Sequence, residues 1–139
     1  MLVQCIANTG IAIPEKYRNW EVDETIYSTL KINETYHVYG MAFSPKRVDF
    51  LVCSKDGNLD IGWVPQILFN TLEHTIPSDW SIRLPKEDPL YDEIFEQAGT
   101  HAFIGYERLI NSREHFLGIL EREEKELIYF LQNVLKSNF

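Results

Sequence analysis

Residues 35–64 limit the choice of folds more than any other part of this chain, because they read as three consecutive antiparallel strands. The strand segments are TYHVYGMAF, VDFLVCS and LDIGWV, separated by SPKR and KDGN. They are rich in Tyr, Val, Phe and Leu, which suit a pleated, half-buried surface. Pro45 fits the second position of a turn, and Asp56 with Gly57 suits a tight hairpin, where glycine supplies positive φ.

Both faces of the first of these strands are largely apolar, since Tyr36 and Val38 alternate with Tyr39 and Met41. Such a strand is either central in a small barrel or covered on its second side. Pro65 ends the third strand, because proline cannot donate to a ladder. Further short strands are expected at residues 2–7, 27–32, 67–73 and 79–84, the last two as a pair.

The pattern changes to helical spacing after residue 85. Asp88 and Pro89 predict a helix start and Gly99 its end. Residues 100–110 fit a short helix or a packed loop. Residues 111–114 resemble a helix cap, and apolar side chains recur at helical spacing from there to residue 135. Whether this helix continues through Gly118 stays open. Four glutamates are expected on its opposite, solvated face: Glu121, Glu123, Glu124 and Glu126.

These patterns together predict an α+β fold. We expect a small curled antiparallel sheet, or an SH3-like partly open barrel, of five or six short strands covered by C-terminal helices. A chain of 139 residues fits one domain, mainly β over residues 1–85 and mainly α over 86–139. The amphipathic helical stripe favours a lid on the sheet over a partner-binding helix.

The net charge of −8 bears on possible partners. An acidic field repels phosphate backbones, so nucleic-acid binding is disfavoured and a basic protein partner is favoured. The apolar runs are far shorter than the roughly 20 residues that span a bilayer, so no membrane association is expected. Cys5 and Cys53 lack metal-type spacing and predict buried thiols, with cytoplasmic localisation as the default.

The sequence holds no recognisable catalytic or cofactor motif. Four histidines, at 37, 74, 101 and 115, lack the spacing of a zinc site. There is no G-x-S-x-G segment and no phosphate-cradling glycine loop. We therefore expect no metal, no cofactor and no enzymatic activity.

Surface recognition remains, and two acidic stretches are candidate docking surfaces, with a plain solvated face as the alternative for each. The large aromatics are expected to be mostly core, and any that are exposed near acidic residues would anchor a protein partner. The candidate partner-binding residues are Glu87, Asp88, Asp92, Glu93, Glu96, Glu121, Glu123 and Glu124.

Four segments together resemble a family of small bacterial proteins regarded as immunity proteins of polymorphic toxin systems. The segments are VQCIANTG with IPEKY, LKINETYHVYGMAF, GWVPQILFNTLEHTIPSDWSIR and GYERLINSREHFLGILERE. The resemblance implies a non-enzymatic inhibitor that binds and occludes a toxin. The acidic balance agrees with a basic, nuclease-type toxin.

Two other functions stay open from the sequence. One is an adaptor subunit within a larger assembly. The other is a small enzyme or ligand carrier with a pocket at the barrel mouth, where His37, Tyr39 and Trp63 would converge. The sequence does not fix the oligomeric state.

Overall fold

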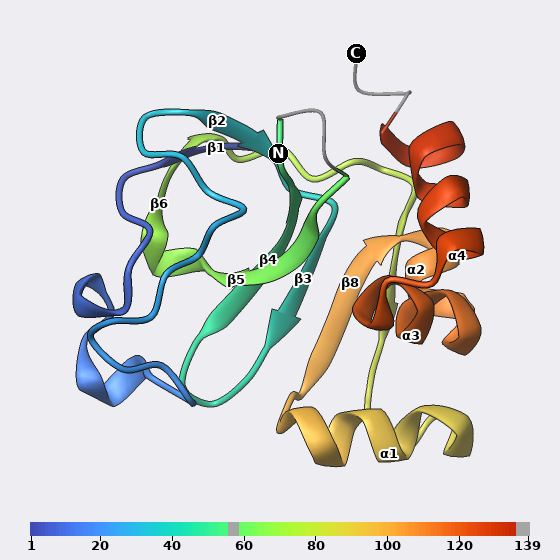
Figure 1. Cartoon of the computed structure of the whole chain (residues 1–139). Helices are drawn as coiled ribbons and strands as arrows, with labels where there is room; N and C mark the ends of the chain where they lie inside the picture. The colour runs from blue at the N-terminus through green and yellow to red at the C-terminus, as the bar shows by residue number, and fades with distance from the viewer. Residues whose placement is uncertain (56–58, 136–139) are drawn as a thin grey trace.

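The computed structural model of the chain describes residues 1–55 and 59–135. The described residues form two antiparallel sheets, with helices packed beside the larger one (Figure 1). The smaller sheet has the order β2 (Thr35–His37), β1 (Leu2–Cys5), β6 (Phe69–Glu73). The larger has the order β5 (Ile61–Pro65), β4 (Val48–Cys53), β3 (Gly40–Phe43), β8 (Ala102–Tyr106), β7 (Trp80–Arg83).

The helical layer follows β7 in the chain and lies to one side of the curled strands (Figure 1). It comprises α1 (Pro89–Ala98), α2 (Glu107–Asn111), α3 (Arg113–Glu121) and α4 (Glu124–Tyr129), which a π-helix, η4 (Phe130–Val134), continues. Short 3₁₀ turns are η1 (Gly10–Ala12), η2 (Glu15–Tyr17) and η3 (Gln66–Leu68). No helix in residues 1–55 and 59–135 has both the length and the apolarity to cross a membrane.

Two hydrophobic cores lie on opposite faces of the larger sheet. Phe50 and Val52 of β4 point into the core shared with the smaller sheet. Leu51 and Cys53, the alternate residues of the same strand, point into the core beneath the helices. The period-2 alternation of β4 therefore serves two buried faces.

The predicted fold class is confirmed: the chain is α+β, with curled antiparallel sheet covered by C-terminal helices and no closed barrel among the described residues. The SPKR turn also forms, with the Ser44 N–H donating to the Arg47 carbonyl at 3.0 Å. Cys5 and Cys53 are buried free thiols. The hairpin predicted at residues 56–57 lies outside the described residues.

The first strand of the predicted meander is divided between the two sheets. The Val38 N–H donates to the Met1 carbonyl, which belongs to the smaller sheet, at 3.1 Å. The next N–H, of Tyr39, donates to Leu51 of the larger sheet at 2.9 Å. A run of strand-forming residues thus crosses from one sheet to the other without a turn signal.

Three predictions from the sequence differ from the structure: the pairing of residues 67–73 with 79–84, the conformation of residues 100–110, and the strand at residues 27–32. Residues 67–73 and 79–84 do contain β6 and β7, but β6 pairs with β1 and β7 pairs with β8. Residues 100–110 contain β8 followed by α2, and β8 inserts between β3 and β7. Residues 27–32 form no strand, because Tyr27 bonds to Asn8 and the chain then turns, with the Leu30 N–H donating to the Tyr27 carbonyl at 3.1 Å.

Helix boundaries follow their local chemistry. Asp88 caps α1 through the Leu90 N–H, Pro89 is the first helical residue, and Gly99 closes the helix in the left-handed region. The C-terminal segment passes through Gly118 but stops at Glu121, because Arg122 adopts a φ of 59°.

Candidate functional site

The acidic residues around α1 are largely occupied by bonds within the fold. Four of the five candidates accept hydrogen bonds from neighbouring groups: Glu87, Asp88, Asp92 and Glu93. Asp88 accepts from the Leu90 N–H at 3.0 Å and lies 3.8 Å from Arg83. Glu96 is exposed and makes no ion pair within the described part of the chain. This stretch therefore offers fewer available carboxylates than the sequence indicated.

The second acidic stretch is divided by the helix break. Glu121, Glu123 and Glu124 are all exposed. Glu126, which the sequence placed with them on a solvated face, is only 4% exposed and points inward. Because Arg122 leaves the helix, its guanidinium pairs with Asp60 of the sheet region.

The inward turn of Glu126 creates a buried polar network between β8 and the helices. The Tyr106 hydroxyl lies 2.7 Å from His115 Nε2, and His115 Nδ1 lies 3.5 Å from Glu126 Oε1. Burial lowers the pKa of His115 and raises that of Tyr106, so a neutral imidazole faces a protonated phenol near neutral pH. His115 is fully buried, so this network links elements and presents no accessible base.

The three residues of the predicted barrel-mouth pocket do not converge. His37 and Tyr39 line a cavity of about 170 Å³ together with Trp80 and Tyr106. Trp63 lines a different, larger pocket. His37 belongs to β2 of the smaller sheet, whereas Trp63 lies on β5 of the larger sheet, so the two side chains line different pockets.

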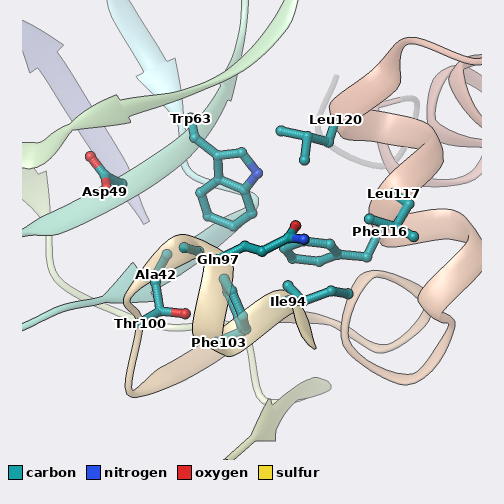
Figure 2. A pocket seen from close by; sticks show the side chains of 11 residues that line it. Ala42, Asp49, Trp63, Ile94, Gln97, Thr100, Phe103, Phe116, Leu117 and Leu120 are labelled. Carbon is teal, nitrogen blue, oxygen red and sulfur yellow. The ribbon is translucent and has the colours of Figure 1, made fainter. Parts of the chain in front are cut away.

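The larger pocket, of about 300 Å³, lies between the five-stranded sheet, α1 and α3 (Figure 2). Its walls are mainly apolar, and Trp63 packs against Phe103 and Phe116 with ring centroids 6.2 and 6.0 Å apart. The sequence did not indicate this pocket, because its lining comes from six separate elements and from Thr100 in the connection before β8. The lining residues are Ala42, Asp49, Trp63, Ile94, Gln97, Ala98, Thr100, Phe103, Phe116, Leu117 and Leu120.

The long connection between β1 and β2 carries the most exposed large apolar side chains of the described chain. Residues 6–34 contain two short 3₁₀ turns and no strand or α-helix. Loops of this length usually serve a function or are disordered. Trp20 is 68% exposed and Ile11 and Ile26 are each 71% exposed. The large aromatics were predicted to be mostly core, so Trp20 was not singled out, although its place in an aperiodic, polar segment is typical of an exposed residue.

These exposed side chains gather on one folded-back part of the connection, which we call the Trp20 lobe (residues 9–27). Thr9 forms an isolated β-bridge with Ile26, and the Gly10 N–H donates to the Thr25 carbonyl at 2.8 Å, which closes the lobe. A Cβ on Gly10 would lie 1.8 Å from the Val22 carbonyl oxygen, so this close approach requires glycine.

A buried ion cluster fixes the lobe to the β3–β4 turn. Arg47 Nη1 lies 2.8 Å from Glu21 Oε1, and the Glu21 side chain is fully buried. Arg47 Nε lies 3.1 Å from Asp49 Oδ1. The Tyr27 hydroxyl donates to the second Glu21 oxygen at 2.5 Å. Trp20 is therefore held by the residue that follows it, in an anchored and preorganised position.

The electrostatics of this cluster favour an ionised Glu21. Burial alone would raise the pKa of its carboxyl, but the hydrogen bonds from Arg47, Tyr27 and the Asn19 N–H outweigh it and lower the pKa to about 2. The pKa of Tyr27 is raised, by burial first and by Glu21 second. The cluster is thus a permanent anchor at neutral pH.

Within the described residues no group of three or more His, Cys, Asp or Glu side chains is placed to hold a metal ion. The arrangement offers an anchored, exposed aromatic lobe and an apolar pocket, joined through Arg47. Comparisons of the chain with protein-family models, with curated proteins and with solved structures found no match.

Proposed function

We propose that this chain is a non-enzymatic protein-binding module that acts as an immunity-like inhibitor, occluding a basic bacterial toxin through the Trp20 lobe. The observation that carries the proposal is the exposure of Trp20 on a loop held by buried Glu21. Interface hot spots favour Trp in preorganised positions, because less conformational entropy is lost on binding.

The surroundings of Trp20 match the anatomy of a protein interface. Its exposed apolar neighbours Ile11, Val22 and Ile26 would form the desolvated centre. Exposed Asp23 and Glu24 would form an acidic rim. The net charge of −8 raises the association rate toward a basic partner.

The test is binding to the protein encoded by the adjacent gene, measured by calorimetry with the full chain. We expect a 1:1 complex that weakens as salt rises and that abolishes the toxicity of that protein. Absence of any complex would contradict the proposal.

Two variants assign the surface. Trp20→Ala should weaken the complex by about 30-fold or more, the cost of removing a hot spot of 2 kcal/mol or more. The matched control is Ile82→Ala, because Ile82 is 57% exposed on β7 and lies outside the lobe. The second variant, Glu96→Gln with Glu121→Gln and Glu124→Gln, tests the helical surface. If it weakens the complex while Trp20→Ala does not, the lobe is not the docking surface.

A further inference from the structure

The apolar pocket beside Trp63 has the size and walls of a small-molecule site. Its volume of about 300 Å³ is at the lower end of the range for such sites, roughly 300–1,000 Å³. In Figure 2 the Trp63 indole and the Phe116 ring face one space, Gln97 extends between them, and Leu120 lies near its upper end. Aromatic walls accept an apolar body, and a Trp face also attracts cations.

The charged lining of this pocket is acidic. Asp49 is its only ionisable lining residue among the residues that the structure describes, and no Lys, Arg or His of those residues lines it. Figure 2 places Asp49 apart from the rings, so the pocket has an acidic end and an apolar end. An anion would be repelled there, and a neutral apolar ligand would leave Asp49 unused.

Asp49 is incompletely neutralised by the protein. Arg47 is shared between two carboxylates, at 2.8 Å from Glu21 and 3.1 Å from Asp49, so the three groups carry a net charge of −1. Asp49 Oδ1 and Arg47 Nε are both buried, and their 3.1 Å contact is an ion pair that lacks hydrogen-bond geometry. Burial raises the pKa of the Asp49 carboxyl, and Arg47 offsets only part of that rise. A bound cation would neutralise the remaining negative charge of these three groups.

A second polar residue of the lining, Thr100, carries a buried hydroxyl. Thr100 is 8% exposed, and its hydroxyl is buried with no hydrogen-bond partner. Buried polar groups are normally satisfied, so an unsatisfied hydroxyl on a pocket wall indicates a place for a polar ligand group. Asp49 and Thr100 both line this pocket.

We propose that this pocket binds a small organic cation with an apolar body, an arylalkyl ammonium or guanidinium, whose charged group lies at Asp49 and whose apolar part lies between Trp63, Phe116 and Leu120. The site is separate from the Trp20 lobe and does not depend on protein binding.

The test uses three probes that share one phenylbutyl body: 4-phenylbutylamine, 4-phenylbutanol and 4-phenylbutyrate. Calorimetry gives their affinities, and the indole N–H signal of Trp63 in ¹H–¹⁵N spectra, assigned with Trp63→Phe, reports the site. We expect the amine to bind about tenfold more tightly than the alcohol, since a charge-assisted hydrogen bond adds about 1.4 kcal/mol, and the carboxylate to bind least.

Two variants and one control locate the interaction. Asp49→Asn should reduce the amine to the affinity of the alcohol and leave the alcohol unchanged. Leu120→Trp should block all three probes by filling the apolar end; because Leu120 is 57% exposed, this change does not disturb the core. The control Glu96→Gln removes an exposed carboxylate of α1 outside the pocket and should change nothing.

Several results would overturn the proposal. Equal affinities of the three probes, tightest binding of the carboxylate, or an unmoved Trp63 signal on amine binding would each do so. Because the probes need no protein partner, their failure leaves the docking role of the Trp20 lobe untouched, and failure of the toxin complex leaves the pocket assignment untouched.

Discussion

Glu21 is the residue on which the anchored lobe depends. Its carboxyl titrates near pH 2 in the folded chain, whereas an unperturbed Glu titrates near 4.5. The unfolded chain therefore binds a proton between these values while the folded chain does not. The stabilisation is fully present above pH 4.5 and is lost as the pH falls to 2.

Glu21→Gln should lower the free energy of unfolding by about 3 kcal/mol at pH 7, because a shift of one pKa unit corresponds to about 1.4 kcal/mol. The difference between wild type and variant should shrink as the pH falls from 4.5 to 2. Urea unfolding at a series of pH values measures it. Glu15→Gln, an exposed carboxylate of the same lobe, is the control. A difference that is constant across this pH range would contradict the assigned role.

Gly118 leaves the space into which the buried Glu126 side chain packs. A Cβ on Gly118 would lie 2.4 Å from Glu126 Cγ, so glycine lets Glu126 pack beneath α3. Gly118→Ala should therefore destabilise the chain by about 1–3 kcal/mol through overpacking. The control is Gly62→Ala, where the nearest atom to the new Cβ is Thr29 Oγ1 at 3.8 Å. Chemical unfolding compares the two, and equal effects would show that Gly118 is not a close-approach site.

Among the elements, β8 shows where sequence reasoning ends. Residues 100–110 were predicted as a short helix or a packed loop, but pairing with β3 on one side and β7 on the other makes AFIGY a strand. Those contacts join residues far apart in the chain, so no local pattern reveals them. By contrast, α1 was predictable, because Asp88, Pro89 and Gly99 each act locally.

The break between α3 and α4 is the feature of the structure that differs most from what the helical periodicity of the sequence predicts. Arg122 is a non-glycine residue at a φ of 59°, a conformation that costs a side chain roughly 1–2 kcal/mol. Periodicity alone predicts one continuous helix. In such a helix, glycine at position 122 would be less favourable than alanine.

Substitutions at position 122 test this difference, because a broken and a continuous helix predict opposite orders of stability for glycine and alanine. Both Arg122→Gly and Arg122→Ala remove the ion pair with Asp60, but only glycine relieves the left-handed backbone. Arg122→Gly should therefore be more stable than Arg122→Ala by about 1 kcal/mol in thermal or urea unfolding. At Lys125, inside α4, the order should reverse. Alanine being the more stable at both positions would mean a continuous helix.

Across the molecule, the arginine side chains form ion pairs with carboxylates of the same chain. Each of the six arginines pairs with a carboxylate: Arg18, Arg47, Arg83, Arg108, Arg113 and Arg122. The acidic excess therefore remains on the surface, including Glu96 and Glu124. Composition predicted the sign of this surface. It did not predict the lobe, which depends on Arg47 pairing with Glu21, or the pocket, whose lining comes from elements far apart in the chain.

The net charge makes a kinetic prediction for the proposed complex with a basic protein. Raising the ionic strength from 50 to 500 mM should lower the association rate constant by about tenfold or more and leave the dissociation rate nearly unchanged, because long-range attraction is screened while contacts at the apolar centre are not. Stopped-flow measurement separates the two rates. A salt effect confined to dissociation would argue against steering by the acidic surface.

Hydrogen–deuterium exchange of the chain with and without the protein encoded beside it locates the docking surface in one measurement. If Trp20 is the anchor, amides of residues 9–27 gain protection in the complex, while α1 and α3 exchange as in the chain alone. Protection confined to residues 87–96 and 121–124, with the Trp20 lobe unchanged, would contradict this account.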